Sequence, residues 1–98
     1  MGVIKRIRIR AQARRVAKRW QWVRGRDVVP LCGLDPFQFI GIGPSAYTGV
    51  VARGGKACPV VVMACSLEDA KREVRTVVSA RGYRGYSTNV RPMGVVSV

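Results

Sequence analysis

The residues with the clearest chemical potential in this sequence are cations, and they gather in its first quarter. Residues 1–26 contain eight Arg and two Lys but no Asp or Glu. Polyphosphates attract such segments because each neutralised phosphate releases condensed counterions, and the guanidinium fork matches a phosphate bidentately. Ten like charges also repel one another, so the segment needs a counter-charge. The predicted nucleic-acid contacts of this segment are Arg8, Arg10, Arg14, Arg15, Lys18, Arg19, Arg24 and Arg26.

Two later clusters of cations are further candidate contacts. Arg53 and Lys56 flank two glycines that are typical of a hairpin turn, so both cations would lie at a loop tip. Residues 81–86 interleave cations, glycines and aromatics, a combination in which Tyr stacks on a base while Arg reaches a phosphate. This pattern favours single-stranded RNA. The structural alternative for residues 81–86 is a helix end followed by a strand, and for Arg53 and Lys56 it is a simple hairpin. The predicted contacts here are Arg81, Tyr83, Arg84 and Tyr86.

Catalysis and metal binding are not expected from the other polar residues. Histidine is absent, which removes the most common general base and metal ligand. The spacing of Cys32, Cys58 and Cys65 matches no structural zinc site, and three cysteines cannot form a closed set of disulfides. The enzymatic alternative is a cysteine enzyme that uses Cys65, which stands just before a predicted helix. We predict no catalytic residues, no metal and no cofactor.

An amphipathic helix would position the N-terminal cations. From Ile9 onward, apolar residues recur at the helical spacings i, i+3, i+4 and i+7. The stripe consists of Ile9, Ala13, Val16, Ala17, Trp20 and Val23. Residues 7–10 alternate instead, so the chain before Ile9 could be extended, and Gly25 is a plausible stop. Trp20 is expected in the core, whereas Trp22, on the opposite face, is open to stacking, a protein contact or burial.

The remaining residues predict a small α+β domain. Residues 27–36 contain two prolines and a glycine and are interpreted as a linker. Strands are expected at 37–42, 47–52 and 59–64, the last without alternation and therefore buried on both faces. A helix would begin after Ser66, pair Glu68 with Arg72, and bury a stripe that includes Val74 and Val77 before it ends at Gly82. Strands at 86–90 and 95–98 would follow.

The expected architecture is therefore a basic amphipathic helix or arm (1–26), a linker (27–36) and a small α+β domain (37–98). In that domain one helix packs on a mostly antiparallel sheet of order β-β-β-α-β, with one optional further strand. A chain of 98 residues is one domain at most. The longest nearly apolar run, 57–65, is far shorter than the ~20 residues that span a bilayer, and no secretory signal is recognised.

Composition favours a binding module over an enzyme. The formal net charge of +13 predicts a polyanionic or acidic partner, while a hydrophobic content of 48% excludes a wholly disordered basic tail. We expect a non-enzymatic structural subunit that binds nucleic acid, RNA rather than DNA, inside an assembly such as a ribosome or virion. The alternative is a subunit whose basic helix docks on an acidic protein surface; an anionic membrane is a third partner. The odd cysteine count favours a reducing, intracellular setting, and the Arg-rich start leaves an organelle open.

Overall fold

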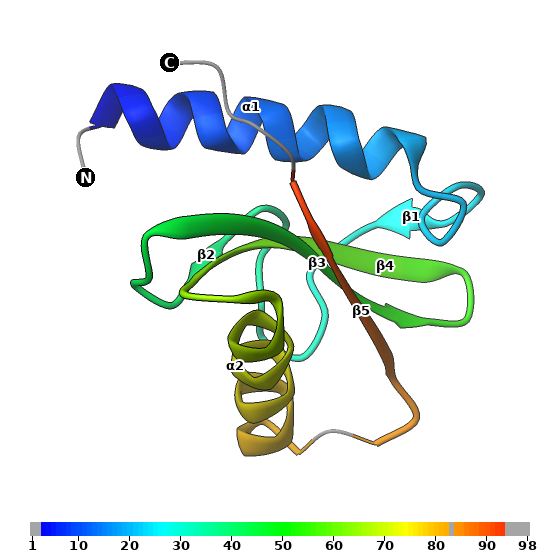
Figure 1. Cartoon of the computed structure of the whole chain (residues 1–98). Coiled ribbons are helices and arrows are strands. Elements are labelled where there is room, and N and C mark those ends of the chain that lie inside the picture. Colours follow the sequence, from blue (N-terminus) through cyan, green and yellow to red (C-terminus); the bar gives the residue numbers. More distant parts are fainter. Residues whose placement is uncertain (1–2, 83, 94–98) are drawn as a thin grey trace.

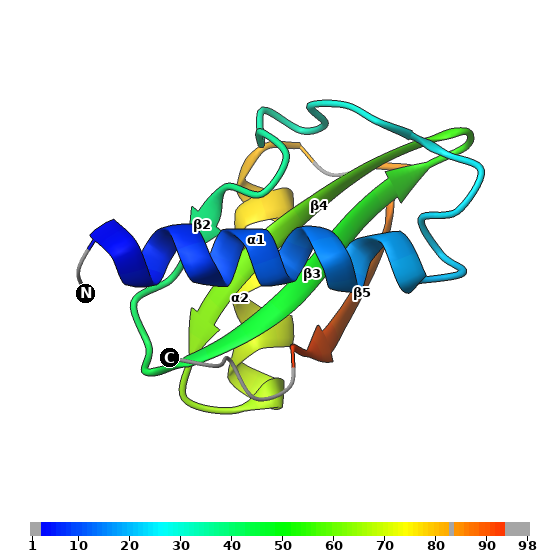
Figure 2. The same cartoon turned by 90° about the horizontal axis from the view of Figure 1, so that it is seen from above.

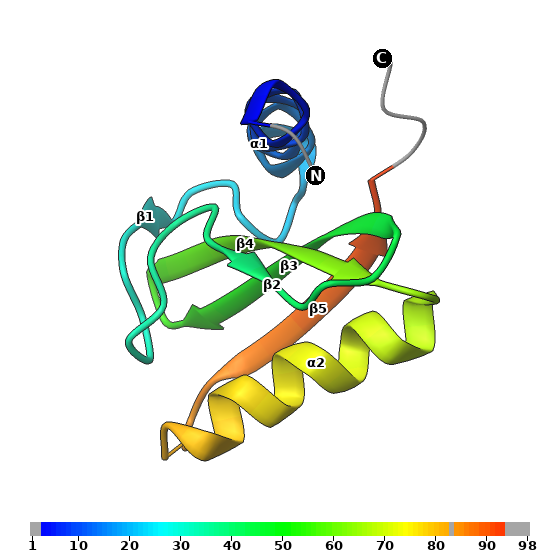
Figure 3. The same ribbon diagram turned by 90° about the vertical axis from the view of Figure 1, so that its left-hand side faces the viewer.

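Two helices cover the two faces of a five-stranded sheet (Figures 1 and 3). The computed structural model describes residues 3–82 and 84–93. Helix α1 (Val3–Arg19) lies on one face and helix α2 (Leu67–Ala80) on the other. The strands are β1 (Asp27–Val28), β2 (Phe39–Ile40), β3 (Ser45–Arg53), β4 (Lys56–Ala64) and β5 (Ser87–Pro92). The predicted α+β class is confirmed, and the strand expected at 95–98 lies outside the described residues.

The sheet is mostly antiparallel, as expected. Its strand order is β1-β4-β3-β5, and β2 pairs with the same edge of β4 as β1. Strands β3 and β4 form a hairpin whose pairing runs from Ser45↔Ala64 to Arg53↔Lys56. Strand β5 adds antiparallel to β3, whereas β1 and β2 are short parallel additions. The sheet therefore depends on the long hairpin at its centre.

Strand β4 is buried on both faces, which confirms the expectation from its unbroken apolar run. Val60 and Val62 belong to the cluster under α2, while Val61 and Met63 pack with Ile9 of α1. Alternate residues of a strand point to opposite faces, so two covering layers are needed to bury such a run. The two helices supply those layers.

Pro59 lies in the middle of this central strand without disturbing it. Its carbonyl oxygen accepts a hydrogen bond from the Phe37 N–H, on the edge of β4 where β1 and β2 pair. The nitrogen of a strand residue points to the same side as its carbonyl. β1 pairs with residues 56 and 57 and β2 with residues 61 and 62, so Pro59 falls in the gap between them. A missing N–H at this position removes no ladder bond.

Helix α1 packs across the sheet through the predicted stripe (Figure 2). Ile9, Ala13, Ala17, Trp20 and Val23 are buried, and Val16 is half-buried. The helix already includes residues 3–8, so the extended start that we considered is wrong: the alternation at 7–10 is too short to outweigh the helical stripe that follows. It ends at Arg19, six residues before Gly25, because the Trp20 carbonyl accepts from the Val23 and Arg24 N–H groups in a separate turn.

The segment 27–36, interpreted from its prolines as a linker, is attached to the sheet instead. It contains β1, and the Val29 N–H donates to the carbonyl of Ala57. Leu31 and Leu34 pair with each other around a tight turn, and Leu34 is fully buried in the cluster under α2. A strand of two residues has too little pattern to be recognised against a proline-rich background.

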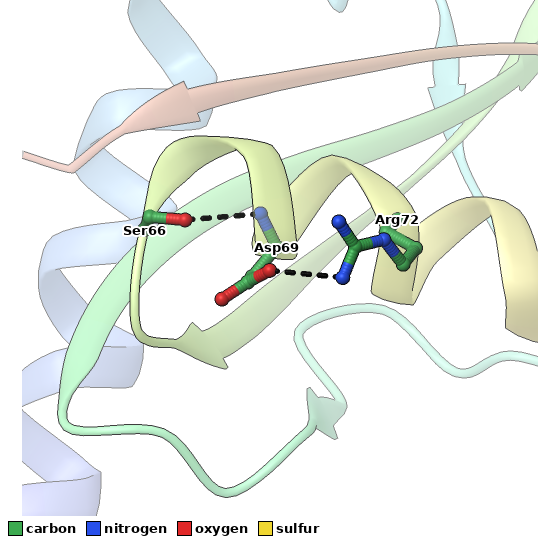
Figure 4. Close-up of polar contacts among 3 residues, drawn as sticks. All are labelled: Ser66, Asp69 and Arg72. Atoms are coloured by element: carbon green, nitrogen blue, oxygen red, sulfur yellow. Dashed lines mark hydrogen bonds and ion pairs between the residues drawn. The ribbon is translucent and has the colours of Figure 1, made fainter.

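Helix α2 begins as predicted: the Ser66 Oγ accepts a hydrogen bond from the Asp69 N–H at 3.2 Å (Figure 4). The expected Glu68–Arg72 pair is wrong. Arg72 bonds Asp69 at 3.1 Å and Glu68 lies 3.9 Å from Lys71, so both pairs are three residues apart rather than four. The buried face is centred on Ala70, Val74 and Val78, with Val77 only half-buried.

Close packing of α2 depends on a glycine in β3. A Cβ atom at Gly49 would lie 3.2–3.3 Å from methyl groups of Val60, Val62 and Val74. These distances are tighter than ordinary van der Waals contact, so even alanine at this position would require the neighbouring valine methyl groups to shift by a few tenths of an ångström.

We predict that Val74→Ala lowers the free energy of unfolding by about 1–2.5 kcal/mol, because it removes buried methyl groups and leaves a cavity. The matched substitution Val77→Ala has a smaller effect, since that side chain is half-buried. Urea denaturation of both variants measures the difference. Equal losses, or a larger loss for Val77→Ala, would show that α2 presents a different face to the sheet.

Candidate nucleic-acid interface

The side of α1 turned away from the sheet is covered by cations. Burial of the apolar stripe fixes the rotation of the helix about its axis, and every Lys and Arg side chain of α1 described by the structure is exposed. We call this set the α1 surface: Lys5, Arg6, Arg8, Arg10, Arg14, Arg15, Lys18 and Arg19. The structure thus brings six predicted contacts together and adds Lys5 and Arg6, which are not among the predicted contacts.

No carboxylate of the described residues forms an ion pair with the α1 surface. The ion pairs in that part of the chain, Glu68–Lys71 and Asp69–Arg72, both lie on α2. Arg6, Arg10, Arg14 and Lys18 follow one another at four-residue spacing, a like-charge arrangement that destabilises an isolated helix. The first turn also lacks an acid to complement the helix dipole. An anionic partner would relieve both costs.

One flank of the α1 surface rests on two phenylalanine rings. The guanidinium carbons of Arg6 and Arg10 lie 5.5 and 5.4 Å from the centre of the Phe39 ring, and that of Arg14 lies 5.4 Å from the centre of Phe37. A guanidinium stacked on a ring keeps its N–H donors at the edge, where a phosphate can accept them. The sequence predicted only a strand at Phe37 and Phe39, so their position under these arginines was missed.

Arg91 of β5 is a further cation near α1 that sequence reasoning missed. Its guanidinium carbon lies 5.1 Å from the Trp20 ring centre, and Arg91 faces the α1 side of the sheet because it pairs with Thr48. Trp20 itself is only 5% exposed, which confirms the expectation that it belongs to the core. No sequence signal marks Arg91, because its relation to Trp20 depends on how α1 crosses β5.

The turn after α1 holds one exposed cation and one that is hydrogen-bonded to the backbone. Arg24 is exposed. Arg26 donates from Nε to the carbonyl of Gly54 at 3.0 Å and from Nη1 to the carbonyl of Trp22, and it covers the Trp22 ring at 5.2 Å. Arg26 therefore ties this turn to the β3–β4 hairpin. Trp22 is half-buried beneath it, which leaves little of the ring open for base stacking.

The predicted contacts at the β3–β4 turn lie in a different place from the α1 surface. A shallow cavity of about 480 Å³, which we call the hairpin pocket, is lined by Asp27, Leu31, Arg53, Gly54, Gly55, Lys56 and Tyr86. The guanidinium of Arg53 lies 5.4 Å from the Tyr86 ring centre. Tyr86 and Leu31 pack against the cluster under α2, so the pocket opens on the α2 side of the sheet.

The predicted contacts in 81–86 are only partly described. Arg81 follows α2 and donates from Nη1 to the carbonyl of Gly33 at 3.1 Å, a contact that ties the end of the helix to the 31–34 turn. Arg84 is exposed, and Tyr83 lies outside the described residues. The single-stranded RNA interpretation of this stretch stays a prediction.

The cysteine side chains do not form a reactive cluster. Cys58 is fully buried, and its thiol donates to the carbonyl of Leu34 at 3.4 Å. Burial raises the pKa of the Cys58 thiol to about 11, which keeps it protonated and weakly nucleophilic. Cys32 is half-buried and Cys65 exposed. Across residues 3–82 and 84–93, no three His, Cys, Asp or Glu side chains are placed to hold a metal ion.

Comparison of the chain with protein-family models, with curated proteins and with solved structures found no match. None of the helices that the structure describes has the length and apolar character needed to cross a membrane.

We predict that the pKa of Cys58 makes stability depend on alkaline pH. Below pH 9.0, its ordinary pKa, the thiol is protonated in both states; between 9.0 and about 11 only the unfolded chain loses the proton. The free energy of unfolding therefore falls across this window, and Cys58→Ala makes the fall shallower. Urea denaturation over this pH range measures both proteins. Parallel profiles would show that Cys58 titrates normally in the fold.

Proposed function

We propose that this protein binds nucleic acid through the α1 surface, as a non-enzymatic structural subunit of a larger assembly, with RNA favoured over DNA. One observation carries the proposal: one helix exposes eight cations that no carboxylate of the described residues pairs with, while its opposite side is buried against the sheet. A solvated charge run with no partner would leave this repulsion unrelieved.

The packing of α1 supports binding by a preorganised surface. Ile9, Ala13 and Trp20 are buried against the sheet, and the Gln12 Nε2 donates to the carbonyl of Met93 at 3.3 Å. The backbone that carries the cations is therefore already ordered before a partner arrives, which reduces the entropy lost on binding. Release of counterions from the phosphates then provides the favourable free energy.

The composition of the surface supports phosphate contacts more than base-specific contacts. Its cations are long side chains, and six of the eight are Arg. Three of these guanidinium groups lie over the Phe37 or Phe39 ring. Contacts to phosphate fix position and carry no sequence information by themselves. The preference for RNA rests on the alternation of Arg and Tyr in 81–86, which suits splayed single-stranded bases.

An acidic protein surface is the second candidate partner, and one observation favours it. Ile7 lies among the cations of α1 and is 60% exposed. An apolar side chain in that position gains from burial against a protein surface, where a phosphate backbone offers nothing comparable. The two candidates differ in how binding responds to salt and to nucleic acid.

We predict that replacing Arg15, Lys18 and Arg19 with Gln weakens binding to RNA and makes the log–log salt dependence shallower. The slope should change by up to about 2.7 for a duplex and about 2.1 for a single strand if all three contact phosphate. Glutamine keeps good helix propensity, so α1 should remain folded. Fluorescence anisotropy at several salt concentrations measures the effect.

A matched control removes the same number of charges from α2. This control replaces Lys71, Arg72 and Arg75 with Gln. It has the same net charge as the α1 variant but keeps the α1 surface intact. This control should keep the wild-type slope. If the α1 variant and the α2 control behave alike, the effect is one of total charge and the α1 surface is not the site. If wild type and both variants fail to bind any nucleic acid, the acidic-protein candidate replaces the proposal.

A further inference from the structure

The closing pair of the β3–β4 hairpin places two cations directly opposite each other. Arg53 and Lys56 are register partners across the Gly54–Gly55 turn, and both are exposed. Like charges that face each other across strands destabilise a hairpin. Neither cation takes part in the ion pairs of the described residues. Asp27, the register partner of Lys56 on β1, offsets part of this repulsion, and an anion bound between the two cations would remove the rest.

The hairpin pocket gives such an anion access to both cations. Its volume of about 480 Å³ falls in the range of ligand sites, about 300–1,000 Å³. No atom lies within 4 Å of a Cβ built on Gly54 or Gly55, so the turn leaves the approach open. The Tyr86 ring holds the Arg53 guanidinium in place, while Lys56 contributes a movable point charge. Asp27 is the carboxylate in the lining and lowers the net charge to +1.

The chemistry of the pocket fits a phosphate better than a stacked base. Arg53 already covers one face of the Tyr86 ring, which is half-buried. The guanidinium fork and the lysine ammonium together match phosphate oxygens. Base stacking on Tyr86 would have to displace Arg53 from its ring.

The pocket and the α1 surface lie on opposite sides of the sheet. Residues two apart in a strand point to the same face of the sheet. Arg53 therefore shares the face of Val51, and Lys56 that of Cys58, and both Val51 and Cys58 pack in the cluster under α2. Val16 of α1 and Trp20 and Val23 of the turn that follows it pack instead on Val50, Ala52 and Ala57 from the other face. Figure 3 shows α1 on one side of the sheet and α2 on the other. A nucleic-acid segment that lies along α1 is therefore on the other face of the sheet from the pocket, which the Arg26–Gly54 hydrogen bond places beside the turn that follows α1.

We propose that the hairpin pocket binds a phosphate of a second nucleic-acid segment, so that one protein molecule bridges two segments. This inference rests on the proposed function, because it assumes that the α1 surface holds the first segment. It adds that the predicted contacts form two sites that act on different strands or on distant parts of one folded RNA.

Energy transfer between two RNA duplexes tests the bridge. One duplex carries a donor and the other an acceptor, with protein well below the RNA concentration so that general charge neutralisation is avoided. Wild type should produce transfer, and Arg53→Gln/Lys56→Gln should reduce it to the level without protein. The double variant should still bind a single duplex as tightly as the control Lys71→Gln/Arg72→Gln, which has the same net charge.

A single substitution, together with the measurement of duplex binding, separates the possible failures. Lys56→Gln alone keeps the Arg53–Tyr86 contact and should lose part of the transfer without a lower melting temperature, so the test does not depend on the double variant folding well. Wild type that binds duplex but gives no transfer would overturn the bridge and leave the proposed function standing. Transfer by the double variant equal to that of the control would also overturn the pocket's role. Absence of any RNA binding would instead contradict the proposed function.

Discussion

Burial of β4 on both faces is the constraint on which the rest of the structure depends. The strand is apolar from Ala57 to Ala64 and lies fully inside. Because its side chains alternate between faces, a single covering layer would leave half of them in water. Helix α2 covers one face, and α1 must cover the other. Because the stripe from Ile9 to Trp20 packs on that face, the cations of α1 point away from the sheet. The basic surface is thus a consequence of how the core is closed.

Outward cations carry a cost that the fold alone does not remove. Side chains at four-residue spacing along α1 repel one another, and salt screens such repulsion only beyond about 10 Å at 0.1 M. The Phe37 and Phe39 rings offset part of it by holding three guanidinium groups against their faces. Apolar burial stabilises the helix in spite of the remaining repulsion, and the surface stays in a state that an anion would stabilise further. Structure and electrostatics therefore favour the same kind of partner.

Much of this arrangement could be predicted from the sequence, because the longest patterns are local. The stripe of α1, the burial of β4 and the Ser66 cap follow from spacing alone. Strand β1 has two residues and no readable period, so it was missed. A strand was predicted at 37–42, where β2 lies, but its parallel pairing with β4 is not a local property of the sequence. Contacts such as Arg91 on Trp20 require the crossing of α1 over β5. Arg53 and Lys56 were recognised as candidates, yet their separation from α1 depends on which face each helix covers, and that is a property of the assembled sheet.

The most direct test of the account is a nuclear magnetic resonance titration of the arginine side chains with a short RNA at low salt. The Nε–Hε resonances report on individual guanidinium groups, so the surface that meets phosphate can be located without any substitution. The account predicts shifts for Arg8, Arg15 and Arg19 that exceed those of Arg72 and Arg75 on α2. Equal small shifts across all these groups, or shifts confined to α2, would contradict the claim that α1 is turned outward to bind a polyanion.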